Sequence, residues 1–135
     1  MATGKIELNG IKFEPLTLNF TTVNCTGTIA IQVPNMIYIS TDKKFLWCTG
    51  TRVTISNFHR TEDNPGIGVN TNIIPTNSIS CHCGIRFDNT NVRPENVWFL
   101  LNSSGRMTFK TTESYSNASG DPLHFLINSF IVPIN

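Results

Sequence analysis

One short segment, Cys81-His82-Cys83, carries residue types that bind metal ions. Thiolates and imidazoles are the usual ligands of zinc, which takes four of them in a structural site. The surrounding residues alternate as in a strand, and in a strand His82 points away from both thiols. The two sulfurs would lie about 6.5 Å apart along one face, too far for a disulfide between them without a bend. We expect no metal and no cofactor here.

The four cysteines are Cys25, Cys48, Cys81 and Cys83. Their spacing is not that of a small secreted disulfide scaffold. The sequence favours free, mostly buried thiols, which behave as small apolar side chains. A disulfide, or a zinc site completed by Cys25 and Cys48, remains an alternative.

Hydrolytic chemistry has few candidates in this chain. Ser119-Gly120-Asp121 and His124 are close in sequence, but a catalytic triad is defined by spatial roles, and the G-x-S-x-G elbow is absent. Glu62 with Asp63 or Glu95 could form the carboxylate pair of a glycosidase. Adjacent acids in a Pro- and Gly-containing segment are typical of a solvated turn, so we predict no catalytic residues and no enzyme activity.

Binding through neutral polar side chains fits the composition better. Asn, Asp, Thr and Ser side chains supply the hydrogen-bonding groups that orient a polar ligand, such as a carbohydrate. Two polar segments could present them, and the candidate residues are His59, Arg60, Glu62, Asp63 and Asn64 in the first, and Tyr115 and Asn117 in the second. The tryptophans, Trp47 and Trp98, lie within predicted strands, where core packing is expected rather than stacking on a sugar.

Charge and length exclude several classes of protein. The 135 residues carry a net charge of +1, and only 14% are charged, whereas 16 Asn, 17 Thr and 10 Ser supply polarity. The ten Lys and Arg are scattered, which argues against nucleic-acid binding. No apolar stretch approaches the length of a membrane span, and we see no signal peptide, so we expect no membrane insertion. The length predicts one domain over residues 1–135.

The residue types favour strands over helices. Fifteen Ile, seven Val and seventeen Thr accompany only three Ala, and β-branched side chains suit a pleated sheet. Asn9-Gly10 predicts a hairpin turn between two alternating arms. Further strands are expected at residues 16–20, 29–33, 36–39, 45–48 and 52–58. Residues 59–77 interrupt the pattern as a long functional loop, with a short strand at Ile73-Ile74.

The second half of the chain continues the alternation. In residues 79–87, Ile79, Cys81, Cys83, Ile85 and Phe87 are expected on one face, and Ser80, His82, Gly84 and Arg86 on the other. Residues 97–101 and 106–111 predict a hairpin. Residues 124–134 are nearly continuously apolar, which indicates a central strand or a subunit contact. Together the strands predict an antiparallel β-sandwich, jelly-roll-like, with eight to ten short strands.

The segment from Arg93-Pro94 through Val97-Trp98-Phe99-Leu100-Leu101 to the Gly105 turn resembles the closing region of phage tail-fibre and baseplate receptor-binding head domains. Arg52-Val53-Thr54-Ile55 is similar to the opening strand of such domains. The resemblance covers the C-terminal two thirds of the chain. It departs where these domains have a leucine-proline turn, which is here Phe87-Asp88-Asn89-Thr90-Asn91.

The resemblance implies a homotrimeric virion component, made in the host cytosol, that binds a cell-surface glycan or protein receptor. Two other functions fit the same composition and fold. One is a lectin-type carbohydrate-binding protein that is not viral, and the other is a purely structural virion or capsid β-sandwich.

Overall fold

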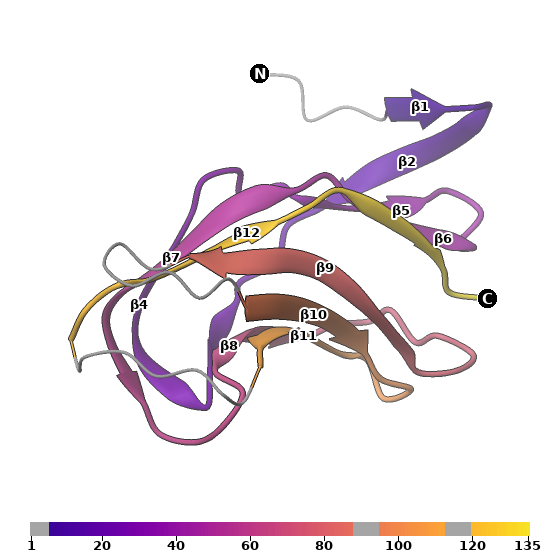
Figure 1. Cartoon of the computed structure of the whole chain (residues 1–135). Coiled ribbons are helices and arrows are strands. Elements are labelled where there is room, and N and C mark those ends of the chain that lie inside the picture. Colours follow the sequence, from indigo (N-terminus) through magenta and orange to yellow (C-terminus); the bar gives the residue numbers. More distant parts are fainter. Residues whose placement is uncertain (1–5, 88–94, 113–119) are drawn as a thin grey trace.

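The computed structural model describes residues 6–87, 95–112 and 120–135, which form β-strands joined by turns (Figure 1). These residues contain thirteen strands in two antiparallel sheets. They confirm the predicted all-β sandwich, with more strands than the expected eight to ten. Within the described residues, no helix is long and apolar enough to span a membrane.

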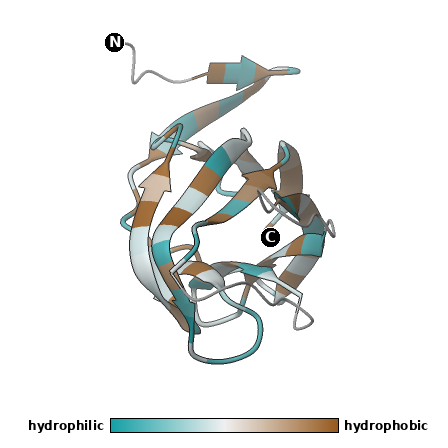
Figure 2. Cartoon of the chain, turned by 60° about the vertical axis from the view of Figure 1, so that its left-hand side comes forward, coloured by the Kyte–Doolittle hydropathy of each residue, from teal (hydrophilic) through white to brown (hydrophobic). Residues whose placement is uncertain are grey.

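The smaller sheet has five strands in the order β1-β2-β5-β6-β13. Their bounds are Ile6–Leu8, Ile11–Leu16, Ile37–Ser40, Phe45–Cys48 and Phe130–Pro133. The predicted hairpin is confirmed, because Asn9 and Gly10 link β1 to β2 with φ angles of 50° and 81°. β1 and the start of β2, with which it pairs, project away from the other strands in both views (Figures 1 and 2).

The larger sheet has eight strands in the order β3-β8-β11-β10-β9-β12-β7-β4. Their bounds in that order are Thr21–Val23, Gly66–Asn70, Arg106–Thr111, Glu95–Leu101, Ile79–Phe87, Leu123–Ile127, Thr51–Arg60 and Cys25–Ile31. The two edge strands, β3 and β4, are consecutive in the chain and joined by Asn24 at φ 57°. The sheet therefore curls until its edges nearly meet, and its strands surround a common interior (Figure 2).

Aromatic side chains join the two sheets in the core. The ring of Phe99 on β10 lies 5.2 Å from that of Phe109 on β11 and 4.9 Å from that of Phe130 on β13. From the smaller sheet, Leu46 and Cys48 are fully buried in the same cluster. Burying side chains of this size contributes about 1.5–3 kcal/mol each, so this cluster is the main source of stability.

A β-bulge in β9 changes which of its residues are buried. Val97 pairs with Gly84 but Trp98 pairs with His82, which leaves Cys83 as an extra residue. An extra residue shifts all later side chains to the opposite face. The predicted alternation holds up to Cys83 and is wrong beyond it, since Arg86 is 2% exposed and Phe87 is 41% exposed.

The apolar C-terminal segment forms two strands in different sheets. β12 lies between β7 and β9 in the larger sheet, and β13 is an edge of the smaller sheet. The chain passes from one sheet to the other at Asn128 and Ser129, the polar residues that interrupt the apolar run. The expectation of a central strand holds for β12, but the apolar run forms two strands rather than one, and its apolar residues serve two different sheets.

Two further sequence predictions are wrong. Residues 17–20 do not form a strand, and the chain next pairs at Thr21–Val23. The expected loop at residues 59–77 begins inside β7 and contains β8, whereas Ile73 and Ile74 are not in a strand. β8 contains Gly66 and Gly68, and glycine is depleted in strands, which hid this element. A Cβ on Gly66 would overlap the backbone oxygen of Phe109, so close strand packing requires glycine there.

Candidate functional site

A shallow polar hollow of about 630 Å³ lies where β7 ends and the chain turns toward β8. It is lined by Asn24, Arg60, Thr61, Glu62, Asp63 and Asn64. Four predicted site residues are thus brought together: Arg60, Glu62, Asp63 and Asn64. The Arg60 guanidinium lies 3.5 Å from the Asp63 carboxylate, with both side chains well exposed. A ligand can therefore reach a cation, carboxylates and an amide in one place.

Asn24 holds this hollow in shape. Its carbonyl oxygen accepts hydrogen bonds from the backbone N–H groups of Thr61 and Glu62, at 2.9 and 3.1 Å. Its side-chain amide donates to the carbonyls of Asp63 and Asn64, at 2.8 and 3.2 Å. Sequence reasoning missed Asn24, because the contact spans about forty residues and no local pattern indicates it.

The other predicted site residues do not line this hollow in the described structure. His59, next to Arg60 on β7, is not part of the lining, and its Nε2 lies 3.3 Å from the Asn57 side-chain oxygen. Tyr115 and Asn117 lie outside the described residues. Described residues before and after them are hydrogen-bonded to the segment around β7. The backbone N–H of Thr111 donates to the Pro65 carbonyl, and that of Gly120 donates to the Phe58 carbonyl.

A second surface is centred on Trp98, which is 43% exposed. The expectation that Trp98 packs in the core is wrong, because Val97 and Phe99 take the inward positions of β10. His82 lies opposite on β9, edge-on to the indole at 5.8 Å, and its Nε2 is 3.0 Å from the Asn96 side-chain oxygen. Lys110 is the cross-strand partner of Trp98 on β11. We call Trp98, His82, Asn96 and Lys110 the Trp98 platform.

Trp47, the other tryptophan, is half-buried on the outer side of the smaller sheet. Its ring packs against Phe13 at 5.3 Å and Tyr38 at 5.8 Å. Ile131 is its cross-strand partner on β13 and is 41% exposed. We call Phe13, Tyr38, Trp47 and Ile131 the aromatic face. On β1 and β2, Ile6 pairs with Phe13 on this same side of the sheet.

The four cysteines are free thiols, three of them buried and Cys81 partly exposed. His82 points outward, as the alternation predicted, away from the inward-facing Cys81 and Cys83. Burial raises the pKa of Cys48 to about 11 and also raises the pKa of Cys25, Cys81 and Cys83, so these thiols are poor nucleophiles near neutral pH. Within the described part of the chain, no three His, Cys, Asp or Glu side chains are placed to bind a metal ion.

The groups considered for hydrolysis have other contacts. The Nδ1 atom of the His124 ring lies 2.9 Å from the Thr54 hydroxyl and 3.4 Å from the Arg52 guanidinium, and Ser119 lies outside the described residues. Glu95 is paired with Arg86 in the interior. These contacts give both side chains structural roles.

Comparison of the chain with protein-family models, with curated proteins and with solved structures found no match.

Proposed function

We propose that this protein is a host-surface attachment domain, part of a viral or phage tail fibre, that binds a cell-surface glycan. The observation that carries the proposal is the Trp98 platform. An exposed indole on a rigid strand offers a flat apolar surface to the C–H face of a sugar ring. His82, Asn96 and Lys110 stand beside it and can hydrogen-bond to the hydroxyl groups around that ring.

The polar hollow supports the same function as a second contact for a branched or extended glycan. Its Arg60, Asp63 and Asn64 side chains offer donors and acceptors to hydroxyl groups. The Asn24 hydrogen bonds fix the turn before a ligand arrives, so binding requires little further ordering.

A homotrimer is the assembly that we propose for this function. The aromatic face is the surface offered for subunit contact, since Ile131 and Trp47 extend an apolar surface on the outer side of the smaller sheet. The β1–β2 hairpin continues that surface with Ile6, Leu8 and Ile11. Three copies would present three weak sugar sites together, and simultaneous binding raises the overall affinity by orders of magnitude.

A glycan array probed with the purified protein tests the attachment function. We expect saturable binding to bacterial surface polysaccharides that Trp98→Ala weakens by at least tenfold. Leu126→Ala is the matched control, because Leu126 is a similarly exposed apolar residue of the larger sheet at 39% and lacks an aromatic ring. Arg60→Ala tests the hollow separately. Absence of saturable binding would favour a purely structural virion sandwich, and shortening of the oligosaccharide would indicate an enzyme.

Sedimentation equilibrium tests the assembly. A trimer of 15.0 kDa chains has a mass of about 45 kDa. We expect Ile131→Asp to release monomers, because a charge at a desolvated contact is unfavourable. Saturable glycan binding by a native monomer would favour a non-viral lectin.

A further inference from the structure

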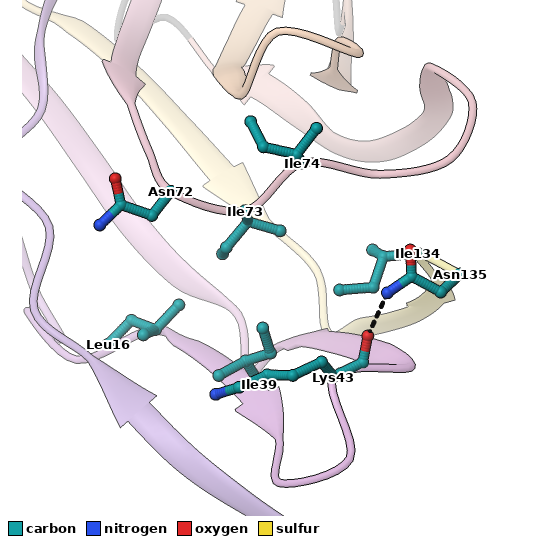
Figure 3. Close-up of a pocket in the computed structure, with 8 residues that line it drawn as sticks. All are labelled: Leu16, Ile39, Lys43, Asn72, Ile73, Ile74, Ile134 and Asn135. Atoms are coloured by element: carbon teal, nitrogen blue, oxygen red, sulfur yellow. Dashed lines mark hydrogen bonds between the residues drawn. The ribbon is translucent and has the colours of Figure 1, made fainter.

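A cleft of about 390 Å³ opens where the turn between β5 and β6, the segment after β8 and the end of the chain meet (Figure 3). Five aliphatic side chains line it: Leu16, Ile39, Ile73, Ile74 and Ile134. Three polar side chains complete the lining: Lys43, Asn72 and Asn135. Its size and mostly apolar walls with few polar groups are typical of a small-molecule site.

The apolar walls include surface that a ligand would cover. Ile74 is 54% exposed at the opening, whereas Ile73 and Ile134 are almost fully buried deeper in the wall. Figure 3 shows Ile73 and Ile74 on one side of the cleft and Leu16 and Ile39 on the other. An aliphatic chain placed between them would be removed from water on both sides, which is favourable in proportion to the area covered.

Lys43 has the only charged side chain in this lining. Its side chain lies along the cleft and brings its ammonium group toward Leu16 (Figure 3). Among the described residues it makes no ion pair. A cation beside an apolar channel attracts a ligand whose charged end is anionic, and it stays solvated until such a ligand arrives.

The backbone at Lys43 is in an unusual conformation for this residue type. Its φ is 62°, and the other described non-glycine residues with positive φ are all asparagine: Asn9, Asn24, Asn57 and Asn64. Asparagine tolerates this conformation because its side chain hydrogen-bonds locally, whereas lysine gains no such compensation. A lysine in a turn position suited to Asn or Gly points to a role for its side chain.

Hydrogen bonds hold the cleft open in advance. The backbone N–H of Ile134 donates to Lys44 at 2.8 Å, and its carbonyl accepts from Thr76 at 3.0 Å. The Asn135 amide donates to the Lys43 carbonyl at 2.6 Å. On the opposite wall, the N–H of Ile73 donates to the Thr71 hydroxyl at 3.0 Å. A preformed site of this kind needs little reorganisation to bind.

We propose that this cleft binds a medium-chain monocarboxylate, with its aliphatic chain against the isoleucines and its carboxylate on Lys43. The proposal does not depend on glycan attachment, since it concerns other residues and another class of ligand. A sugar fits poorly among five aliphatic side chains, because its hydroxyl groups would lose their water without gaining hydrogen-bond partners.

Isothermal titration with octanoate, 1-octanol and butyrate tests the ligand class. We expect saturable octanoate binding, at least fivefold weaker binding of the uncharged 1-octanol, and more than tenfold weaker binding of butyrate, which has four fewer methylenes. Methyl shifts in a titration followed by NMR should be confined to the aliphatic residues that line the cleft: Leu16, Ile39, Ile73, Ile74 and Ile134. Equal binding of 1-octanol, or of the neutral peptide acetyl-Leu-Leu-amide, would overturn the proposal, as would shifts elsewhere.

Lys43→Asn tests the residue that carries the charge. We expect octanoate affinity to fall roughly tenfold, while the midpoint of urea unfolding stays the same or rises, because Asn suits the positive φ. The matched control is Lys44→Asn, which removes the neighbouring exposed cation that does not line the cleft and should leave octanoate binding unchanged. Unchanged octanoate binding in Lys43→Asn, or an equal loss in both variants, would overturn the assignment.

Discussion

Arg86 and Glu95 face each other across β9 and β10, with the guanidinium Nη2 3.3 Å from the carboxylate Oε1. Their side chains are only 3% and 10% exposed, so this ion pair lies inside the sandwich. The Thr112 hydroxyl donates to the other carboxylate oxygen at 2.7 Å. Removing two charges from water costs several kcal/mol per ion, and their attraction offsets this cost only while both are present.

Glu95→Gln should therefore destabilise the protein by about 3–5 kcal/mol, because it leaves the Arg86 charge buried opposite a neutral amide. The free energy of unfolding in urea measures this loss. Asp63→Asn is the control, since it breaks the exposed pair with Arg60 and should cost less than about 1 kcal/mol. Similar losses in the two variants would contradict a special role for burial.

Local patterns in the sequence predicted the local parts of this fold. Asn9-Gly10 indicated the β1–β2 hairpin, since both residues tolerate the positive φ that the turn requires. The strands expected at residues 36–39 and 45–48 are found as β5 and β6, which pair with each other across a short turn. Such features depend on neighbouring residues alone, so the sequence is sufficient to indicate them.

Features set by distant contacts could not be predicted. The bulge at Cys83 depends on how β9 fits between β10 and β12. Because of this bulge Arg86 is buried, whereas the two-residue alternation predicts that it is exposed. Trp98 is exposed because Val97 and Phe99 fill the interior of the larger sheet. For the hollow, the sequence indicates the polar side chains of residues 60–64 but not Asn24, which reaches them from the junction of β3 and β4.

Gly84→Ala should be strongly destabilising. A Cβ at Gly84 would overlap the backbone carbonyl oxygen of Leu126 on β12, and backbone atoms cannot move aside without separating the strands. We expect a loss of about 3 kcal/mol in the free energy of unfolding, measured by thermal or urea denaturation. Gly10→Ala should cost only about 1 kcal/mol, since nothing lies within 4 Å and only its positive φ is strained. An equally small loss at Gly84 would contradict this close packing.

The buried thiols should make stability fall at alkaline pH. Burial raises the pKa of Cys48 from 9.0 to about 11, so above pH 9 the unfolded chain releases a proton that the folded chain retains. The unfolded state is then favoured as pH rises from 9 to 11, with a loss on the order of 2 kcal/mol from this group. Below pH 9 this contribution to stability is fully present.

Urea unfolding of the native protein and of Cys48→Ala between pH 7 and pH 11 measures this contribution. All other ionisable groups are common to the two proteins, so their effects cancel in the difference. We expect the variant to be less stable at pH 7, because it leaves a cavity, but to lose less stability between pH 9 and pH 11. Parallel curves for the two proteins would show that the Cys48 thiol does not cause the decline.

The turn that forms the polar hollow should depend on the Asn24 side chain. Asn24→Gly keeps the positive φ of 57° but removes the two amide hydrogen bonds to Asp63 and Asn64, and we expect a loss of about 1–2 kcal/mol. Asn24→Ala should lose roughly 1 kcal/mol more, because alanine is strained at this φ. Asn57→Gly is the control, since Asn57 also has a positive φ, and its side-chain oxygen lies beside the exposed His59 ring rather than against the turn. Amide hydrogen exchange at Thr61 and Glu62 should be faster in Asn24→Gly than in Asn57→Gly, and equal exchange would mean that the backbone of Asn24 alone holds the turn.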